Sequence, residues 1–226
     1  NIDNDGWDYV HAHPKIFNDA EVELHYRLSI SHNLFKNRKI QEFWGSHVAD
    51  FFAGKAELPC GEIVCPSAYI HLFYLLHHAF RHLISGGIGL RQIMDIYFAI
   101  LHRDAGMDAR LMKDVNDMGM TRFASASMWV LRTVFALPEI PSLWNADESE
   151  GQFLLNEIMA GGNFGHGDTR FRHPTSRAGK LVEIVRRNLH LLSHYESDAL
   201  AAPFYYIWHF FWKRIQICRM WFRCRV

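Results

Sequence analysis

The spacing of apolar residues changes near Phe35, and this change limits the possible folds more than any other feature of the sequence. Between residues 20 and 28, apolar and polar residues alternate with a period of two, which indicates a strand with a core face and a polar face. After Phe35 the spacing becomes that of amphipathic helices. The residues expected on the core face of the strand are Val22, Leu24, Tyr26 and Leu28.

Turn and helix-end residues divide the chain further. A strand over residues 7–13 is followed by a turn at Pro14–Asp19, so it is expected to form an antiparallel hairpin with the strand at 20–28. Pro66 suits the first turn of a helix, and Gly86-Gly87 suits its end. No further strand is expected. Helices are expected over residues 35–52, 66–84, 89–102, 108–118, 121–135, 148–159, 177–194 and 202–222.

The expected fold class is therefore α+β, with a short antiparallel β-hairpin followed by a predominantly α-helical domain. The boundary is expected near Leu58–Pro66, which gives a first part of residues 1–60 and a helical domain of residues 61–226.

Composition excludes several classes of protein. The 226 residues include 24 Lys and Arg and 24 Asp and Glu, so no net charge attracts nucleic acid, and no nucleic-acid partner is expected. The four cysteines are too few for a disulfide scaffold, and a cytoplasmic protein is expected. No apolar stretch is long enough for a transmembrane segment. The aromatic and basic residues 204–225 fit either a terminal helix docked on the core or an interfacial helix.

Three segments occur in a distinctive order: Val22–Leu28, then His71–His82 running into Gly86–Asp95, then Gly161–Gly165. Together they resemble the uncharacterised nucleotidyltransferase family common in gut Bacteroidetes. The resemblance implies that residues 1–60 are the C-terminal part of a polymerase-β-like nucleotidyltransferase domain. It also implies transfer of a nucleoside monophosphate from an NTP to an unknown acceptor, with Mg²⁺ as the cofactor.

The family pattern has a Gly-Ser at a helix start and an Asp-x-Asp on a strand, both upstream of the strand at Val22–Leu28. Asp3-Asn4-Asp5 has the Asp-x-Asp spacing, but it lies among Asn and Gly instead of strand formers, and no Gly-Ser precedes it. We therefore expect this chain to be the later part of a longer protein, and to be inactive or very weak alone.

The resemblance makes Glu23 the candidate third carboxylate, which would bind Mg²⁺ or activate the acceptor hydroxyl. His25 and Arg27 share the polar face of the same strand, so the three form one candidate catalytic group. The alternative is a solvated outer face of a half-buried sheet.

Two further pairs are candidate nucleotide-binding residues. Arg91 and Asp95 lie four residues apart on an expected helix, so Arg91 can grip a phosphate with Asp95 orienting it. The alternative is a simple intrahelical salt bridge. Asn163 and Gly165 lie in a glycine-rich segment whose backbone N–H groups can surround a phosphate, or which simply ends a helix.

A histidine-rich helix offers another kind of site. His78 and His82 have a spacing that can bind a metal, but the residue after His78 is Ala79, where a zinc peptidase has Glu. His71, His77, His78 and His82 are therefore expected to be histidines packed in a helical core. The rival to the enzyme is a non-catalytic helical binding module on the same scaffold, and a homo-oligomer is possible under either function.

Overall fold

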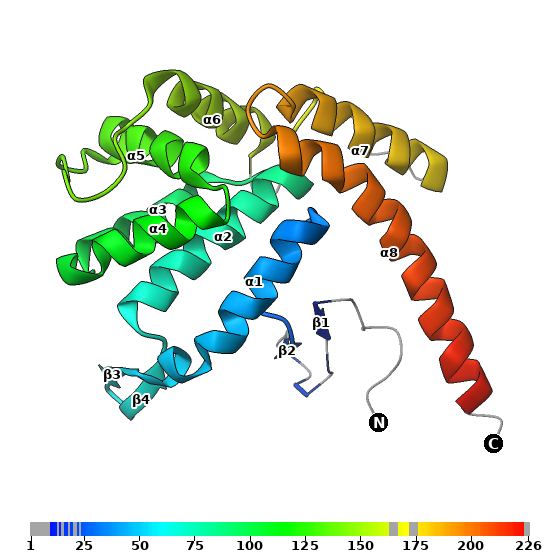
Figure 1. The fold of residues 1–226 in the computed structure, drawn as a ribbon, viewed down its shortest axis with the longest axis horizontal. Coiled ribbons are helices and arrows are strands. Elements are labelled where there is room, and N and C mark those ends of the chain that lie inside the picture. Colours follow the sequence, from blue (N-terminus) through cyan, green and yellow to red (C-terminus); the bar gives the residue numbers. More distant parts are fainter. Residues whose placement is uncertain are drawn as a thin grey trace.

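The computed structural model describes residues 10–12, 14, 16–17, 19, 22, 24–162, 167–171 and 176–223. In these parts the chain is mainly helical, with two small antiparallel hairpins, so the predicted α+β class is confirmed (Figure 1). The helices are α1 (Leu34–Ser46), α2 (Ala68–Ser85), α3 (Leu90–Leu101), α4 (Asp108–Asp117), α5 (Thr121–Phe135), α6 (Glu148–Gly161), α7 (Arg177–Leu191) and α8 (Glu196–Arg223).

The predicted first hairpin is present, but the face that was expected to be buried is exposed. Strands β1 (His11–Ala12) and β2 (Leu24–His25) pair antiparallel, with His11 opposite His25. Leu24 and Tyr26 were expected in the core, yet 57% and 44% of their surfaces are exposed. The physical reason is that this sheet has two strands in the described part of the chain, so it offers little apolar surface for these side chains.

A second hairpin replaces part of an expected helix and the expected linker. The prediction of one helix over residues 35–52 was wrong, because α1 ends at Ser46 and a 3₁₀ helix, η2 (Val48–Phe52), follows it. Strands β3 (Gly54–Leu58) and β4 (Gly61–Cys65) then pair antiparallel, although no further strand was expected. Gly61 has a φ of +127°, which favours glycine at this end of the two-residue turn.

Helices α2 to α7 lie close to their predicted positions, and capping residues define the start of several of them. The prediction for the last helix was wrong at its start, because α8 begins at Glu196 instead of residue 202 and includes Pro203. Ser67 accepts a hydrogen bond from the N–H of Ile70 and begins α2, and Gly86 follows its last residue. Asp147 caps α6, and Ser176 caps α7 in the same way. A short 3₁₀ helix, η3 (Ala105–Met107), precedes α4.

Helix α2 lies at the centre of the core. It contacts α3, α4, α7 and α8, and its side chains Leu72, Phe73 and Leu83 are completely buried. A helix that is apolar on most of its surface is stable only when other elements surround it. Helix α1 joins the same core, since Phe43 stacks on Phe73 at 4.1 Å between ring centroids. The division of the chain at residue 60 stays a prediction.

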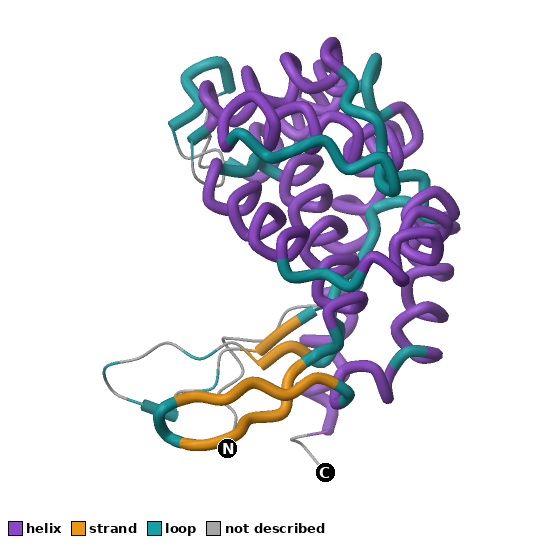
Figure 2. Tube along the Cα trace, turned by 90° about the vertical axis from the view of Figure 1, so that its left-hand side faces the viewer, coloured by secondary structure: helices purple, strands orange, loops and turns teal. Residues whose placement is uncertain are grey.

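The two hairpins lie at the same end of the helical body (Figures 1 and 2). Helix α8 begins against α2, and its second half runs away from the body (Figure 1). None of the described helices is both long enough and apolar enough to cross a membrane.

Candidate functional site

The β1–β2 hairpin carries two of the predicted catalytic residues, His25 and Arg27, which are both half-buried. The backbone N–H groups of Tyr26 and Arg27 each donate to the carbonyl oxygen of Val10 at 3.2 Å, so the chain after β2 stays paired with the first strand. Glu23, the predicted catalytic carboxylate and metal ligand, lies outside the described residues. That these three side chains converge stays a prediction.

The segment after the hairpin is fastened to α1 by buried hydrogen bonds. The indole N–H of Trp44 donates to the hydroxyl of Ser29 at 3.0 Å, and both residues are buried. The Gln41 amide donates to the Ser29 carbonyl oxygen at 2.9 Å. Asn33 then caps α1 by accepting hydrogen bonds from two N–H groups of its first turn. These contacts fix residues 29–33 against the helix.

This fixed segment forms one wall of a cavity of about 20 Å³, which is enough for a molecule the size of water. Helices α1 and α2, the turn after α4 and the start of α8 form the other walls. We call it the His77 cavity. Its polar lining is Ser31, His32, Lys36, His77, Arg81 and Asp198, and its apolar lining is Ile30, Ile40, Phe80, Ile84, Met118 and Met120.

An ion pair joins α1 to α8 at this cavity. The ammonium of Lys36 lies 2.5 Å from a carboxylate oxygen of Asp198, and Asp198 is buried. The hydroxyl of Ser197 donates to the same carboxylate at 3.1 Å. Gly119, with a φ of +69°, leaves room for Lys36, because a Cβ at this position would lie 2.8 Å from the ammonium nitrogen. The turn after α4 therefore leaves space for the end of the lysine side chain.

Two buried histidines of the cavity are neutral. Burial, and next the charge of Arg81, lower the pKa of His32 from 6.5 to about 3. The same two causes, in the same order, lower the pKa of His77 to about 3. His32 packs between the rings of Tyr205 and Tyr206 on α8, with centroids at 4.6 and 5.3 Å. The prediction of core histidines on this helix is confirmed for His77, which is 4% exposed, and wrong for His71, which is exposed; His78 and His82 are half-buried.

Arg81 is the exceptional residue of the cavity. Within the described part of the chain, its guanidinium makes no ion pair, and its buried Nε has no hydrogen-bond partner. The Nδ1 atom of His77, one turn earlier on α2, also has no partner there. Buried polar atoms without a partner are uncommon, although the Arg81 side chain as a whole is half-buried. These two nitrogen atoms were not found from sequence, because nothing in the spacing distinguishes them from an ordinary helix face.

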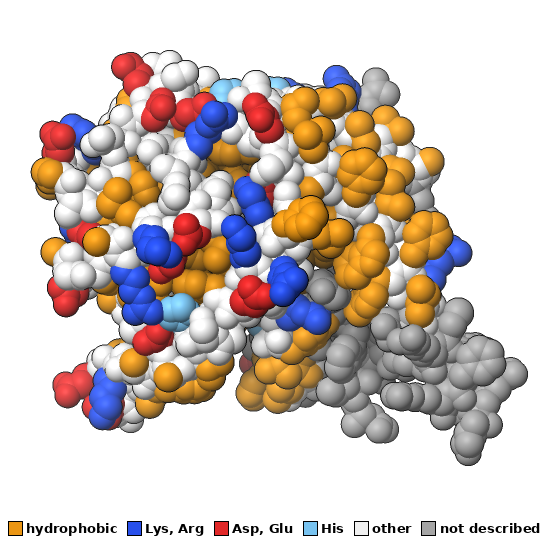
Figure 3. Space-filling model, in the orientation of Figure 1, with side chains coloured by type: hydrophobic (Ala, Val, Ile, Leu, Met, Phe, Trp, Pro, Cys, Tyr) orange, Lys and Arg blue, Asp and Glu red, His pale blue; other side chains and the backbone are white. Residues whose placement is uncertain are grey.

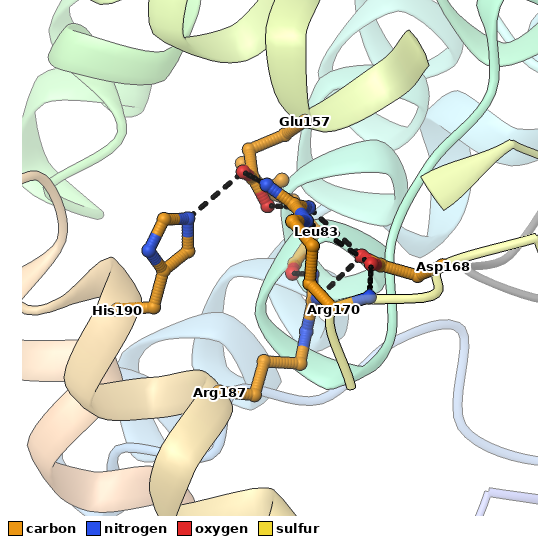
Figure 4. A network of polar contacts seen from close by, with 6 residues as sticks. All are labelled: Leu83, Glu157, Asp168, Arg170, Arg187 and His190. Atoms are coloured by element: carbon orange, nitrogen blue, oxygen red, sulfur yellow. Dashed lines mark hydrogen bonds and ion pairs between the residues drawn. The ribbon is translucent and has the colours of Figure 1, made fainter. Parts of the chain in front are cut away.

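A second polar network lies beside the glycine-rich segment (Figure 4). The guanidinium of Arg170 donates to both oxygens of Glu157, at 2.6 and 3.1 Å, and to both oxygens of Asp168, at 3.0 and 2.8 Å. His190 contacts Glu157 at 2.9 Å, and Arg187 donates to the carbonyl oxygen of Leu83 at 2.8 Å. Asn163 and Gly165, the predicted nucleotide-binding residues of this segment, lie outside the described residues.

The charges of this network are satisfied internally. Hydrogen bonds from the side chain of Arg170 outweigh burial and hold the pKa of Asp168 below its usual value. Burial favours the neutral form of Glu157, but hydrogen bonds from Arg170 and His190 together lower its pKa. Both carboxylates are therefore ionised and paired with Arg170, and the network joins α2, α6 and α7.

Arg91 and Asp95 both lie on the exposed surface of α3. No ion pair or hydrogen bond between them is present in the described structure, and neither lines the His77 cavity. Their predicted role in holding a phosphate stays a prediction.

Among the described residues, no three His, Cys, Asp or Glu side chains lie close enough together to hold a metal ion. His78 and His82, the pair with metal-binding spacing, have Nε2 atoms 3.0 Å apart. A Mg²⁺ ion prefers oxygen ligands, so these two imidazoles do not fit it. The described side chains alone do not form the magnesium site that the sequence predicts.

The fold and these sites define an α+β protein in which two small hairpins are attached to a helical body that contains a small cavity lined by both polar and apolar side chains. The family model of an uncharacterised nucleotidyltransferase matches residues 3–136, which is more than half of the chain. The chain belongs to this family. The matched region contains both hairpins, helices α1 to α5 and every residue that lines the His77 cavity except Asp198. No curated protein and no solved structure matches the chain.

Proposed function

We propose that the protein transfers a nucleoside monophosphate from an NTP to an acceptor, as a member of the polymerase-β-like nucleotidyltransferases. The observation that supports this proposal is the family match over residues 3–136, which includes the strand with Glu23, His25 and Arg27. In the reaction an acceptor hydroxyl forms a bond to the α-phosphorus, and the bond to the leaving pyrophosphate breaks.

The residues of the strand have separable roles in this proposal. Glu23 would bind Mg²⁺ or accept the proton of the acceptor hydroxyl, and the guanidinium of Arg27 would bind a phosphate oxygen. Bound Mg²⁺ would neutralise charge that develops on the phosphates. Glu23 supplies only one carboxylate, so further ligands would have to come from outside the described residues. His25 lies between the two on the chain and would orient the substrate.

The first test is binding, measured as the melting temperature of the 226-residue chain with each of the four NTPs, with and without Mg²⁺. We expect one NTP to raise the melting temperature more when Mg²⁺ is present, because a ligand that binds only the folded state stabilises it. Glu23→Gln should remove the magnesium-dependent part, and Glu57→Gln on the exposed β3 strand is the matched control. We expect little pyrophosphate release from this chain alone. A melting temperature that no NTP changes in either condition contradicts the proposal.

A second function, an interaction module, is supported by an exposed apolar face on α7 and α8. Apolar side chains gather over these two helices (Figure 3). Extended apolar surfaces of this kind usually mark sites of association. The exposed residues of this α7–α8 face are Val182, Val185, Leu189, Leu200, Phe204, Ile207, Trp208, Phe211 and Ile215.

We propose that a second copy of the chain covers the α7–α8 face. Along α8, Leu200, Phe204, Ile207 and Phe211 follow at intervals of 4, 3 and 4 residues, a spacing that is the same in both directions. Two antiparallel α8 helices related by a two-fold axis would therefore place Leu200 opposite Phe211 and Phe204 opposite Ile207. Apolar side chains would meet apolar side chains along the whole contact.

The charges of α8 complement each other in the same arrangement. Glu196 and Arg214 are both exposed and lie just outside opposite ends of the apolar stretch Leu200–Phe211, so Glu196 of each copy would approach Arg214 of the other. The test is sedimentation equilibrium over a hundred-fold range of concentration. We expect a dimer that Phe204→Glu converts to a monomer, whereas Phe98→Glu, at an exposed apolar residue of α3, leaves it dimeric. A wild-type monomer throughout would overturn this proposal.

A further inference from the structure

An open groove lies where α7 and α8 diverge from the turn that joins them (Figure 1). Its volume is about 530 Å³, so it has room for a large side chain, whereas the His77 cavity takes about one water molecule. An open groove with mainly apolar walls favours an apolar occupant. The lining comes from the end of α7, the turn and the start of α8, and it consists of Leu189, Leu192, Ser193, Glu196 and Leu200.

The groove is continuous with the α7–α8 face. Leu189 and Leu200 belong to both, and Leu200 begins the row of exposed apolar residues that continues along α8 to Phe211. In the antiparallel dimer proposed above, Leu200 lies opposite Phe211 of the second copy. Phe211 is 58% exposed in the single chain, so its ring is available for this contact. A ring that lies opposite Leu200 is therefore placed at the groove.

Glu196, which lines the groove, and Arg214 place opposite charges at this contact. Both are exposed, and neither forms an ion pair in the part of the chain that the structure describes. About five helical turns separate them, so both lie on the same side of α8. A two-fold axis between antiparallel helices brings the same side of each helix together, so Glu196 meets Arg214 of the second copy at both ends of the contact. A parallel pair would instead bring like charges together at each end.

We infer that the groove binds the ring of Phe211 of a second copy, and that the pairing of Glu196 with Arg214 fixes the antiparallel direction of the contact. This contact rests on the dimer proposed above and adds to it the residues that hold the two copies together. Each copy supplies one groove and one ring, so every contact occurs twice and the assembly closes at two copies. An aromatic ring seated in a groove is the kind of residue that dominates the free energy of an interface.

The dissociation constant of the dimer, measured by sedimentation equilibrium on the full 226-residue chain, tests the groove. Phe211→Ala should raise this constant by about ten-fold or more, because the groove loses its occupant. Ser193→Trp fills the groove from its wall and should raise the constant by a similar factor. The matched controls are Phe98→Ala on α3 and Ser149→Trp on α6, which change exposed residues outside the groove and should leave the constant unchanged.

Charge reversal tests the direction of the contact. Arg214→Glu alone places two carboxylates together at each end and should raise the dissociation constant by about ten-fold. Glu196→Arg combined with Arg214→Glu restores unlike charges and should recover most of this loss. Glu57→Arg combined with Arg214→Glu has the same net charge, but Glu57 lies on β3, so this control should bind as weakly as Arg214→Glu alone. If the melting temperature shows that Glu196→Arg disturbs the start of α8, Phe211→Ala and Ser193→Trp still decide.

The outcomes separate this contact from the dimer itself. A wild-type dimer that Phe204→Glu dissociates, but that neither Phe211→Ala nor Ser193→Trp weakens, keeps the dimer and overturns the groove contact. A double charge reversal that binds no more tightly than Arg214→Glu alone, with both variants folded, overturns the antiparallel direction. A wild-type chain that is monomeric at every concentration refutes the dimer and the groove contact together. If that monomer sediments with anionic phospholipid vesicles, the α7–α8 face binds a membrane surface instead.

Discussion

Lowering the pH from 7 to 5 is expected to destabilise the protein through His32 and His77. Burial, and next the charge of Arg81, lower the pKa of each from 6.5 to about 3, so both remain neutral in the folded state at pH 5. In the unfolded chain both bind protons at this pH. The unfolded state therefore binds more protons, and the free energy of unfolding falls as the pH drops from about 6.5 towards about 3.

The magnitude follows from the proton affinity that each histidine loses on folding. When the pH falls from 7 to 5, protonation of a histidine with an unfolded pKa of 6.5 lowers the free energy of the unfolded state by about 2 kcal/mol. The value hardly depends on the folded pKa as long as that pKa stays below about 4. The two histidines together should lower the stability by about 4 kcal/mol, a large part of the 5–15 kcal/mol typical of a domain.

The assay is urea unfolding, followed by tryptophan fluorescence, at pH 7 and pH 5. His32→Gln and His77→Gln should each reduce the loss of stability between these pH values by about 2 kcal/mol, because glutamine does not titrate. The other charged groups that face these histidines, namely Lys36, His78, Arg81, Asp198 and His209, are unchanged in both variants.

The control is His102→Gln, which replaces an exposed histidine at the end of α3. We expect it to lose as much stability between pH 7 and pH 5 as the wild type. If His32→Gln and His77→Gln also lose as much as the wild type, the two histidines are not held neutral by burial, and the argument is wrong.

Three further substitutions test the packing. Arg170→Gln should destabilise the fold by about 2–3 kcal/mol in urea unfolding, because Glu157 and Asp168 lose their shared cation. The loss is smaller than for a fully buried ion pair, because the arginine is partly exposed. A loss below about 0.5 kcal/mol, as for ordinary surface changes, would mean that the network does not stabilise the fold. Phe73→Ala should cost about 3–5 kcal/mol, since this completely buried ring leaves a cavity, and an unchanged urea midpoint would contradict the core described above. Gly119→Ala should lower the free energy of unfolding by about 1–2 kcal/mol, and with it the melting temperature, because residue 119 has a φ of +69° and a Cβ there would crowd the ion pair at the His77 cavity. A melting temperature equal to that of the wild type argues against this contact.

Helix positions could be predicted from sequence where side chains mark the ends. Ser67 and Gly86 delimit α2 within two residues of the expected range. Helix α5 occupies residues 121–135, as predicted, although no side chain caps its start. The β3–β4 hairpin escaped prediction because neither of its faces is buried. Its neighbouring residues Ile63 and Val64 point to opposite faces and are both exposed, so no alternation marks the strands.

The candidate sites were predictable only as far as local pattern reaches. The role of His25 and Arg27, which the alternation of the strand put forward, stays a prediction, whereas the helical position of His77 correctly indicated a core histidine. The meeting of Lys36 and Asp198 could not be predicted, because they lie 162 residues apart on two helices whose packing no local signal encodes. The contact of Arg170 with Glu157 could not be predicted for the same reason, since it depends on where a loop crosses α6.

The long separation of Lys36 and Asp198 also bears on the order of folding. Closing a contact over 162 residues costs more chain entropy than forming the helices or the α2–α3 and α5–α6 pairs, so it should form after them. A contact that is absent from the transition state affects mainly the unfolding rate. Removing it by Asp198→Asn should therefore speed unfolding and leave the folding rate nearly unchanged. This one ion pair between α1 and the last helix would then slow unfolding without affecting how fast the protein folds.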